Sequence, residues 1–198
     1  MADISITTTS KPRAAASVQA SGEVAPAAGE PYFDLIELLF FAYRDFVGDP
    51  DEVLAKLGFG RAHHRVLHFV NRNPGMKVAD LLDVLKITKQ SLGRVLKQLI
   101  DEGYVVQKEG ASDRRQRLLY VSQAGETLAM KLAGLQTARI ARVLSELGPG
   151  AREAARRFLA GMIDVKDRDH VLRLIAKSDS FANSLADQTR ARTGDDAP

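Results

Sequence analysis

Polar side chains that can pair with the edges of nucleic-acid bases recur along residues 87–99, "ITKQSLGRVLKQL". Because successive residues of a helix are about 100° apart, Gln90, Arg94 and Lys97 share one face. The opposite face is apolar and carries Leu92, Val95, Leu96, Leu99 and Ile100. Glutamine can pair with adenine and arginine with guanine, each through two parallel hydrogen bonds. A helix about 10–12 Å across fits the major groove of B-DNA, about 12 Å wide, so the pattern predicts a helix that reads base pairs.

The first turn of this helix carries groups that favour phosphate. Thr88 is placed to cap the helix, and the free backbone N–H groups behind it lie at the positive end of the helix dipole. Gly93 costs about 1 kcal/mol relative to alanine in a helix interior, which is explained if the backbone approaches DNA closely there. The residues of this segment that we predict to contact DNA are Thr88, Lys89, Gln90, Ser91, Arg94 and Lys97.

A second basic cluster follows in a predicted β-hairpin. Residues 104–108 ("YVVQK") and 117–121 ("RLLYV") are rich in β-branched and aromatic side chains and flank a polar loop. The arginines at its tip are Arg114, Arg115 and Arg117. A thin basic loop can contact phosphates or enter the narrow minor groove, where the negative potential is enhanced. Asp113 repels phosphate, so we predict that it orients the loop by pairing with a neighbouring arginine.

Two further helices must hold these side chains in place. Apolar residues recur at helical spacing from residue 61 to a terminator at 73–75, and again over 78–85. A tight connection at Lys86-Ile87 joins the second of these helices to the one that begins after Thr88, which is the arrangement of a helix-turn-helix. With the hairpin behind it, the order of elements predicts a winged helix-turn-helix over about residues 61–121.

Long helices are predicted on both sides of this module. Residues 31–48 are apolar on most sides, and Asp49-Pro50 is predicted to end that helix. A second subunit would cover such a helix, so we expect a homodimer. Ser122 caps a long helix over about 123–147, and a break at 148–150 precedes another amphipathic helix. The side chains of this last helix that we expect to point inward are Ala155, Phe158, Leu159, Met162 and Ile163.

The composition bounds the class of protein. Hydrophobic residues are 45% and charged residues 27% of 198, as in soluble globular proteins. Between Arg61 and Arg117, twelve lysines and arginines face six acidic residues, an excess of +6 in a chain of net charge +3, which favours a polyanionic partner. Residues 1–30 and 185–198 offer little to bury and are expected to be disordered tails. Neither a signal peptide nor an apolar run of about 18 residues is apparent, so we expect a cytoplasmic protein.

The segment of residues 78–126 resembles the DNA-binding core of the MarR family of bacterial transcription regulators, most clearly in the wing sequence "DRRQRLLYVSQAGE". The resemblance implies one domain over residues 31–175, with dimerisation helices at 31–48 and 123–175. It implies an obligate homodimer that reads a near-palindromic operator, with Arg115 in the minor groove and Asp113 orienting it. It also implies a repressor that releases double-stranded DNA when a small-molecule effector binds between the winged module and the dimerisation helices.

The sequence departs from the family pattern at one turn and at both ends. Lys86 occupies the turn of the helix-turn-helix, where glycine is commoner. A left-handed lysine costs about 1 kcal/mol, so we expect this turn to differ slightly. The two tails also exceed the usual length of the family, and nothing in their composition explains their purpose.

The sequence also bears on other classes of protein. The chain has no cysteine, no glycine-rich phosphate loop and no HExxH pattern, so we expect neither an enzyme nor a cofactor. His64 and His68 are four residues apart, as metal ligands on one helix face can be, which leaves a metal-responsive regulator as an alternative. Because no further ligand is evident, we expect no metal site. A non-sensing architectural nucleic-acid-binding protein is the other alternative.

Overall fold

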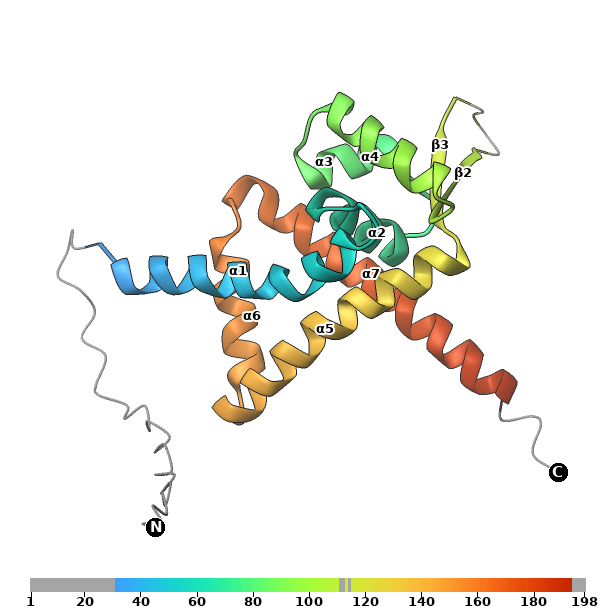
Figure 1. Ribbon diagram of the computed structural model, residues 1–198. Coiled ribbons are helices and arrows are strands. Elements are labelled where there is room, and N and C mark those ends of the chain that lie inside the picture. Colours follow the sequence, from blue (N-terminus) through green and yellow to red (C-terminus); the bar gives the residue numbers. More distant parts are fainter. Residues whose placement is uncertain (1–30, 111–112, 114, 194–198) are drawn as a thin grey trace, which may run out of the picture. The chain divides into compact units, whose positions relative to one another are not determined.

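The structure is a computed structural model that describes residues 31–110, 113 and 115–193, the side chains of residues 185–193 excepted. The chain divides into two compact units, residues 1–39 and 40–198. The described helices and strands follow one another as in Figure 1: α1 (Phe33–Ala55), α2 (Arg61–Arg72), β1 (Met76–Lys77), α3 (Val78–Leu85), α4 (Lys89–Asp101), β2 (Val105–Glu109), β3 (Arg117–Val121), α5 (Gln123–Leu147), α6 (Ala151–Met162) and α7 (Val165–Thr193). The prediction of a mainly helical fold with a small β element is confirmed.

A three-stranded antiparallel sheet contains the predicted hairpin. The strand order is β1–β3–β2, and Val105 of β2 lies opposite Val121 of β3 at the base of the hairpin. β1 adds only Met76, which lies opposite Leu119, and Lys77. This strand was not predicted, because two residues are too few to show the alternation that marks a strand. The sheet is therefore larger than the sequence pattern suggested.

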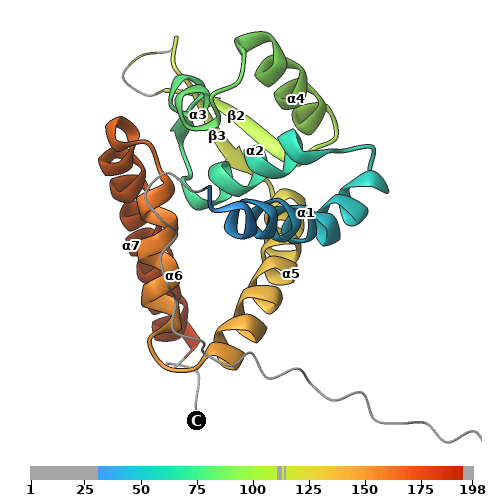
Figure 2. The same cartoon turned by 90° about the vertical axis from the view of Figure 1, so that its left-hand side faces the viewer.

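Helix α2 lies at the centre of the winged module and contacts α3, α4, β3 and α5. Its amphipathic pattern supplies three core side chains on one face, Val66, Leu67 and Val70, which are fully buried. The side chains that meet them from the other elements are Leu81 and Leu85 of α3, Leu92, Leu96 and Leu99 of α4, Leu119 of β3, and Leu128 and Leu132 of α5. Figure 2 shows α5 starting at the base of the hairpin and leading away from α4. The core thus holds both α4 and the hairpin against α2.

Helix α1 does not end where the sequence predicted. The prediction that Asp49-Pro50 terminates it was wrong, because the helix continues through Pro50 to Ala55. Proline lacks a backbone N–H, so it leaves the carbonyl of Phe46 without its usual helical donor. Pro50 and Leu54 are both fully buried, and Leu54 belongs to the core. Burial of this last part of the helix offsets the missing hydrogen bond.

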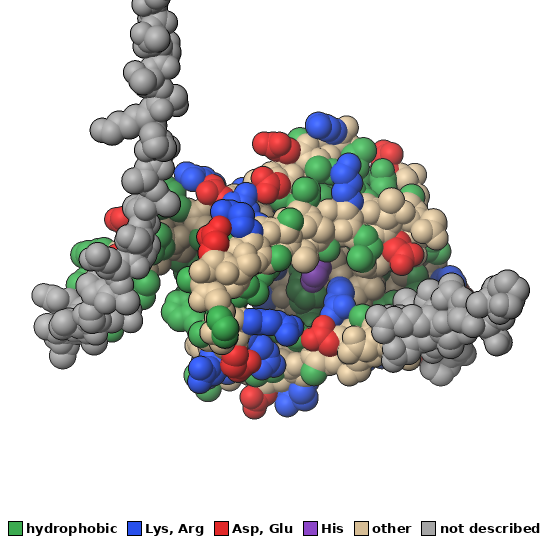
Figure 3. Space-filling model, turned by 90° about the horizontal axis from the view of Figure 1, so that it is seen from below, with side chains coloured by type: hydrophobic (Ala, Val, Ile, Leu, Met, Phe, Trp, Pro, Cys, Tyr) green, Lys and Arg blue, Asp and Glu red, His purple; other side chains and the backbone are tan. Residues whose placement is uncertain are grey.

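The outer helices expose apolar side chains in the single chain. On α6 none of the described side chains is buried, and the prediction that Phe158, Leu159 and Met162 point inward was wrong, since each is more than half exposed. Helix α5 is buried only near its start, and Leu147 at its end is 67% exposed. Figure 3 shows apolar side chains at the surface among charged ones on one face of the molecule. The amphipathic pattern of these helices is real, but its apolar side has no cover within one chain.

Helix α7 extends further than the sequence analysis expected. It runs to Thr193, whereas a disordered tail had been expected from residue 185 onward. The expected N-terminal tail, residues 1–30, lies outside the described residues, as do residues 194–198. None of the helices in the described part of the chain is both long enough and apolar enough to cross a membrane.

Candidate nucleic-acid interface

Helix α4 presents a polar face outward over a buried apolar stripe. Leu92, Val95, Leu96 and Leu99 are buried, as the spacing predicted. On the opposite face Gln90, Arg94 and Lys97 are all exposed. Gly93 lies among them, and a methyl group built there would meet no atom of the described protein within 4 Å. The packing of α4 therefore does not require glycine at this position.

The first turn of α4 is capped as predicted. The Thr88 hydroxyl oxygen accepts a hydrogen bond from the backbone N–H of Ser91 at 3.1 Å and lies 2.9 Å from the Ser91 Oγ. Thr88, Lys89, Gln90 and Ser91 are exposed, so their side chains and the N-terminal end of the helix dipole face solvent. Further along the helix, Lys97 forms an ion pair with Asp101, which partly neutralises its charge.

Two contacts of Gln98 join α4 to residues before it in the chain, and neither was predicted from the sequence. The His63 Nε2 lies 2.9 Å from the Gln98 Oε1, and the Gln98 Nε2 donates to the backbone carbonyl of Gly58 at 3.4 Å. The His63 ring also stacks on Phe59, with centroids 4.8 Å apart. No sequence pattern links these residues, because 35 positions separate His63 from Gln98.

Asp113 accepts hydrogen bonds from backbone N–H groups of the wing loop. Its Oδ1 accepts a hydrogen bond from the backbone N–H of Arg115 at 2.9 Å, and its carbonyl accepts one from the N–H of Gln116 at 3.0 Å. No described arginine side chain forms an ion pair with Asp113, and pairing with Arg114 stays a prediction. Arg115 is exposed at the tip, whereas Arg117 forms an ion pair with Glu109 across the hairpin at 2.9 Å. Arg114 lies outside the described residues.

The turn between α3 and α4 keeps the left-handed geometry despite its lysine. Lys86 has φ 50° and ψ 42°, and its N–H donates to the carbonyl of Leu82 at 3.0 Å. Its ammonium lies 2.7 Å from Asp83 and 3.8 Å from Asp167 of α7. Hydrogen bonding between Lys86 and Asp83 raises the pKa of the lysine and lowers the pKa of the carboxyl. The side chain at this turn thus reaches a second element.

The two histidines weighed as metal ligands have different surroundings. His64 is buried, and burial lowers the pKa of its ring, while the charge of Asp51 acts in the opposite direction. His68 has an exposed side chain. Over the part of the chain that the structure describes, no three histidine, aspartate or glutamate side chains come together as a metal site. The geometry therefore supplies no third ligand for this pair among those residues.

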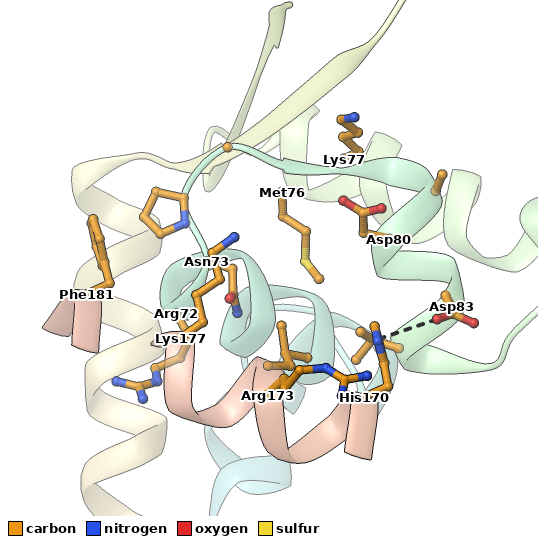
Figure 4. A pocket seen from close by; sticks show the side chains of 15 residues that line it. Arg72, Asn73, Met76, Lys77, Asp80, Asp83, His170, Arg173, Lys177 and Phe181 are labelled. Atoms are coloured by element: carbon orange, nitrogen blue, oxygen red, sulfur yellow. Dashed lines mark ion pairs between the residues drawn. The ribbon is translucent and has the colours of Figure 1, made fainter. Parts of the chain in front are cut away.

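Two cavities lie between α7 and the winged module. The larger has a volume of about 570 Å³, and Figure 4 shows the ion pair of His170 with Asp83 at one end and Phe181 at the other. The smaller has a volume of about 420 Å³, and its lining includes Ile163, Leu174, Ile175 and Lys86. Both are bounded by α7 and α3, so an occupant would contact both elements.

The order of elements, the capped helix α4 with its exposed polar face and the arginine-tipped hairpin define a winged helix-turn-helix protein. Residues 57–116 match the model of the MarR family. The chain is 44% identical over 135 residues to the HTH-type transcriptional regulator PetP of Rhodobacter capsulatus, a match that covers 68% of this chain and 81% of PetP. The chain therefore belongs to the MarR family of transcriptional regulators.

Other relatives agree with this assignment. The HTH-type transcriptional repressor Rv2887 of Mycobacterium tuberculosis is 30% identical over 104 residues, which cover 52% of this chain and 75% of the repressor. The crystal structure of Streptococcus pneumoniae FabT in complex with DNA superposes with a TM-score of 0.60 at 13% identity, over 67% of this chain and 94% of FabT. The latter likeness establishes a shared fold.

Proposed function

We propose that this regulator binds double-stranded DNA in a sequence-specific manner and represses transcription. The observation that carries the proposal is the exposed face of α4, where Gln90 and Arg94 stand clear of a fully packed opposite face. Such side chains can pair with base edges in the major groove, while the capped N-terminus of the helix favours phosphate. Arg115, exposed at the tip of the wing, is suited to the minor groove. The FabT structure was solved with DNA, and Rv2887 is a repressor, which supports the same reading.

The apolar surfaces of the outer helices support a homodimer. Phe40, Phe41 and Tyr43 of α1 are each at least 55% exposed, and the exposed apolar residues of α5 and α6 add to this surface. Surfaces of this kind usually mark protein contacts in soluble proteins. A second copy of the chain would cover them and present two α4 helices to one duplex. Half-site centres should then lie about 10 bp apart, on a near-palindromic operator.

The cavities beside α7 are the proposed place for a small-molecule effector. Lys77, Arg173 and Lys177 line the larger one, and no ion pair involves them within the residues that the structure describes. Met76 and Phe181 give the same cavity apolar surface. An anionic molecule with an apolar part would satisfy both kinds of wall. Because the cavity touches both α7 and α3, occupancy can change how α4 is held.

The DNA-binding proposal is tested by capturing genomic fragments with the purified protein and sequencing them. A shared near-palindromic motif is expected among the fragments, and a gel-shift titration should confirm it against a shuffled duplex. Fragments without a common motif, bound as tightly as random DNA, would instead identify the architectural alternative. Analytical ultracentrifugation at micromolar concentration should give the mass of a dimer, and a monomer would contradict the proposed assembly.

A further inference from the structure

Lys86 is the one non-glycine residue with a positive φ in the described part of the chain. Left-handed backbone favours glycine, because a side chain there brings Cβ close to the backbone carbonyl. The turn itself therefore gains nothing from a lysine at this position. A strained residue that persists points to a role for its side chain.

The side chain of Lys86 connects the helix-turn-helix to α7. Its ammonium lies between the carboxylates of Asp83 on α3 and Asp167 on α7. The Asp83 Oδ2 lies a further 3.6 Å from the His170 Nε2, also on α7. These four residues, Asp83, Lys86, Asp167 and His170, join the turn that precedes α4 to the first part of α7, and we refer to them as the latch.

Helix α7 also contacts the end of α2, so the latch connects the turn to a helix that other contacts hold in place. Near its middle, Ser178 is buried, and its Oγ lies 3.0 Å from the Asn73 Oδ1 at the end of α2. Asp179 forms an ion pair with Arg72 of α2. The latch therefore acts on the turn and α4, which have no other ion pair to α7 among the described side chains.

We infer that Lys86 is a positioning residue, which holds the turn and the start of α4 against α7 in the arrangement that binds DNA. This inference rests on the proposed DNA binding. Exposed ion pairs contribute at most about 1 kcal/mol to the free energy of unfolding. We therefore expect the latch to change the melting temperature little and to act by restricting the motion of α4 before DNA binds. All four latch residues also line the smaller cavity. An anion in that cavity competes with Asp83 and Asp167 for Lys86, which links effector binding to the position of α4.

The decisive variant is Asp167→Asn, because simple electrostatics and the latch predict opposite results. Removing a negative charge from a DNA-binding protein should tighten binding to a polyanion. Loss of the latch should instead weaken operator binding three- to tenfold, measured by fluorescence anisotropy with unchanged melting temperature. Asp169→Asn is the matched control, since it removes the same charge from an exposed side chain of α7 that lies outside the latch, and it should bind the operator as tightly as the native protein or slightly more tightly. Unchanged or tighter operator binding by Asp167→Asn would overturn the inference.

Lys86→Gly and Lys86→Arg separate the turn from the side chain. Lys86→Gly relieves the backbone strain, so the melting temperature should stay at or above that of the native protein while operator affinity falls three- to tenfold. Lys86→Arg should keep native affinity, and combining Lys86→Gly with Asp167→Asn should cost no more than either change alone. If Lys86→Gly binds the operator as tightly as the native protein, the turn alone matters and the latch is disproved.

Hydrogen exchange tests the latch without DNA. Amides of residues 86–95 should exchange faster in Asp167→Asn and in Lys86→Gly than in the native protein and in Asp169→Asn, with no change over α5. Equal exchange in all four proteins would refute the latch. If the native protein selects no operator but the exchange difference is present, the proposed function fails and the latch stands as a structural tie.

Discussion

The His63 Nε2 lies 2.9 Å from the Gln98 Oε1, which joins the first turn of α2 to the back of α4. The other ring nitrogen, Nδ1, accepts a hydrogen bond from the backbone N–H of Gly60 at 3.1 Å. A ring that accepts at Nδ1 and donates at Nε2 is the neutral tautomer with its proton on Nε2. We expect these contacts to resist rotation of α4 about its own axis, a rotation that would change the direction in which Gln90 and Arg94 point.

The two glutamines of α4 should behave differently when they are changed to alanine. Gln98→Ala breaks the bond to His63, so we expect a loss of about 1 kcal/mol in the free energy of unfolding and weaker binding to every DNA sequence. Gln90→Ala removes an exposed side chain, so stability should be unchanged while base preference is relaxed at one operator position per half-site. Urea denaturation and binding-site selection measure the two effects. If both variants changed stability and base preference to the same extent, the assignment of Gln98 to the inner face and Gln90 to the outer face of α4 would be contradicted.

Gly93→Ala should stabilise the protein and yet weaken its binding to DNA. The added methyl group meets open space in the protein, so helix propensity should raise the free energy of unfolding by about 1 kcal/mol. If the backbone of α4 approaches DNA closely at Gly93, the same methyl group obstructs the complex. Gly134→Ala on α5 is the control, because it also meets open space and should stabilise the protein without changing DNA affinity. Native affinity in Gly93→Ala would rule out close approach at that residue.

The arginines of the wing offer a second comparison. Arg115 is exposed at the tip, whereas Arg117 is paired with Glu109. Arg115→Ala should lower operator affinity by about 1–3 kcal/mol without changing the bases preferred in the major groove. Arg117→Ala should have a smaller effect, because part of its charge is already neutralised by Glu109. A change in the major-groove consensus with Arg115→Ala would count against placing the wing in the minor groove.

Stability should fall in mild acid because of His64. Burial lowers the pKa of His64 below its ordinary value of 6.5, so the unfolded chain takes up a proton at a higher pH than the folded chain does. The contribution of neutral His64 to the free energy of unfolding is fully present above pH 6.5. It declines as the pH falls below that value, and it declines no further below the pKa of His64 in the folded chain. One group contributes at most about 1.4 kcal/mol per pH unit. Urea unfolding between pH 5 and pH 8 should show a shallower slope in His64→Gln, and an unaltered slope would contradict the assignment.

Local patterns in the sequence predicted correctly which side chains of α4 are buried and which are exposed. The period of Leu92, Val95 and Leu99 placed Gln90 and Arg94 on the outer face of α4, because burial on a helix follows from spacing alone. Contacts between distant elements could not be read in this way. The bond from His63 to Gln98 and the contact from Lys86 to Asp167 depend on how the helices pack.

The errors in the helices have physical causes of the same kind. Pro50 lowers the local preference for helix, but the burial of Leu54 beyond it outweighs that preference in the folded chain. Phe158 and Leu159 form a true apolar stripe, yet a stripe does not state which chain covers it. The sequence therefore predicts the amphipathic face of α6 and leaves its partner to be found in the assembly.

We expect the exposed face of α4 to distinguish one DNA sequence from another. The test is a competition between the operator obtained from genomic capture and a shuffled duplex, at physiological salt, for the native protein and for Arg94→Ala. The native protein should prefer the operator by a factor of about 10³ or more, and Arg94→Ala should lose about 1–3 kcal/mol of operator binding while its affinity for the shuffled duplex changes less. Equal affinity of the native protein for both duplexes, or an operator affinity that Arg94→Ala leaves unchanged, would contradict that claim.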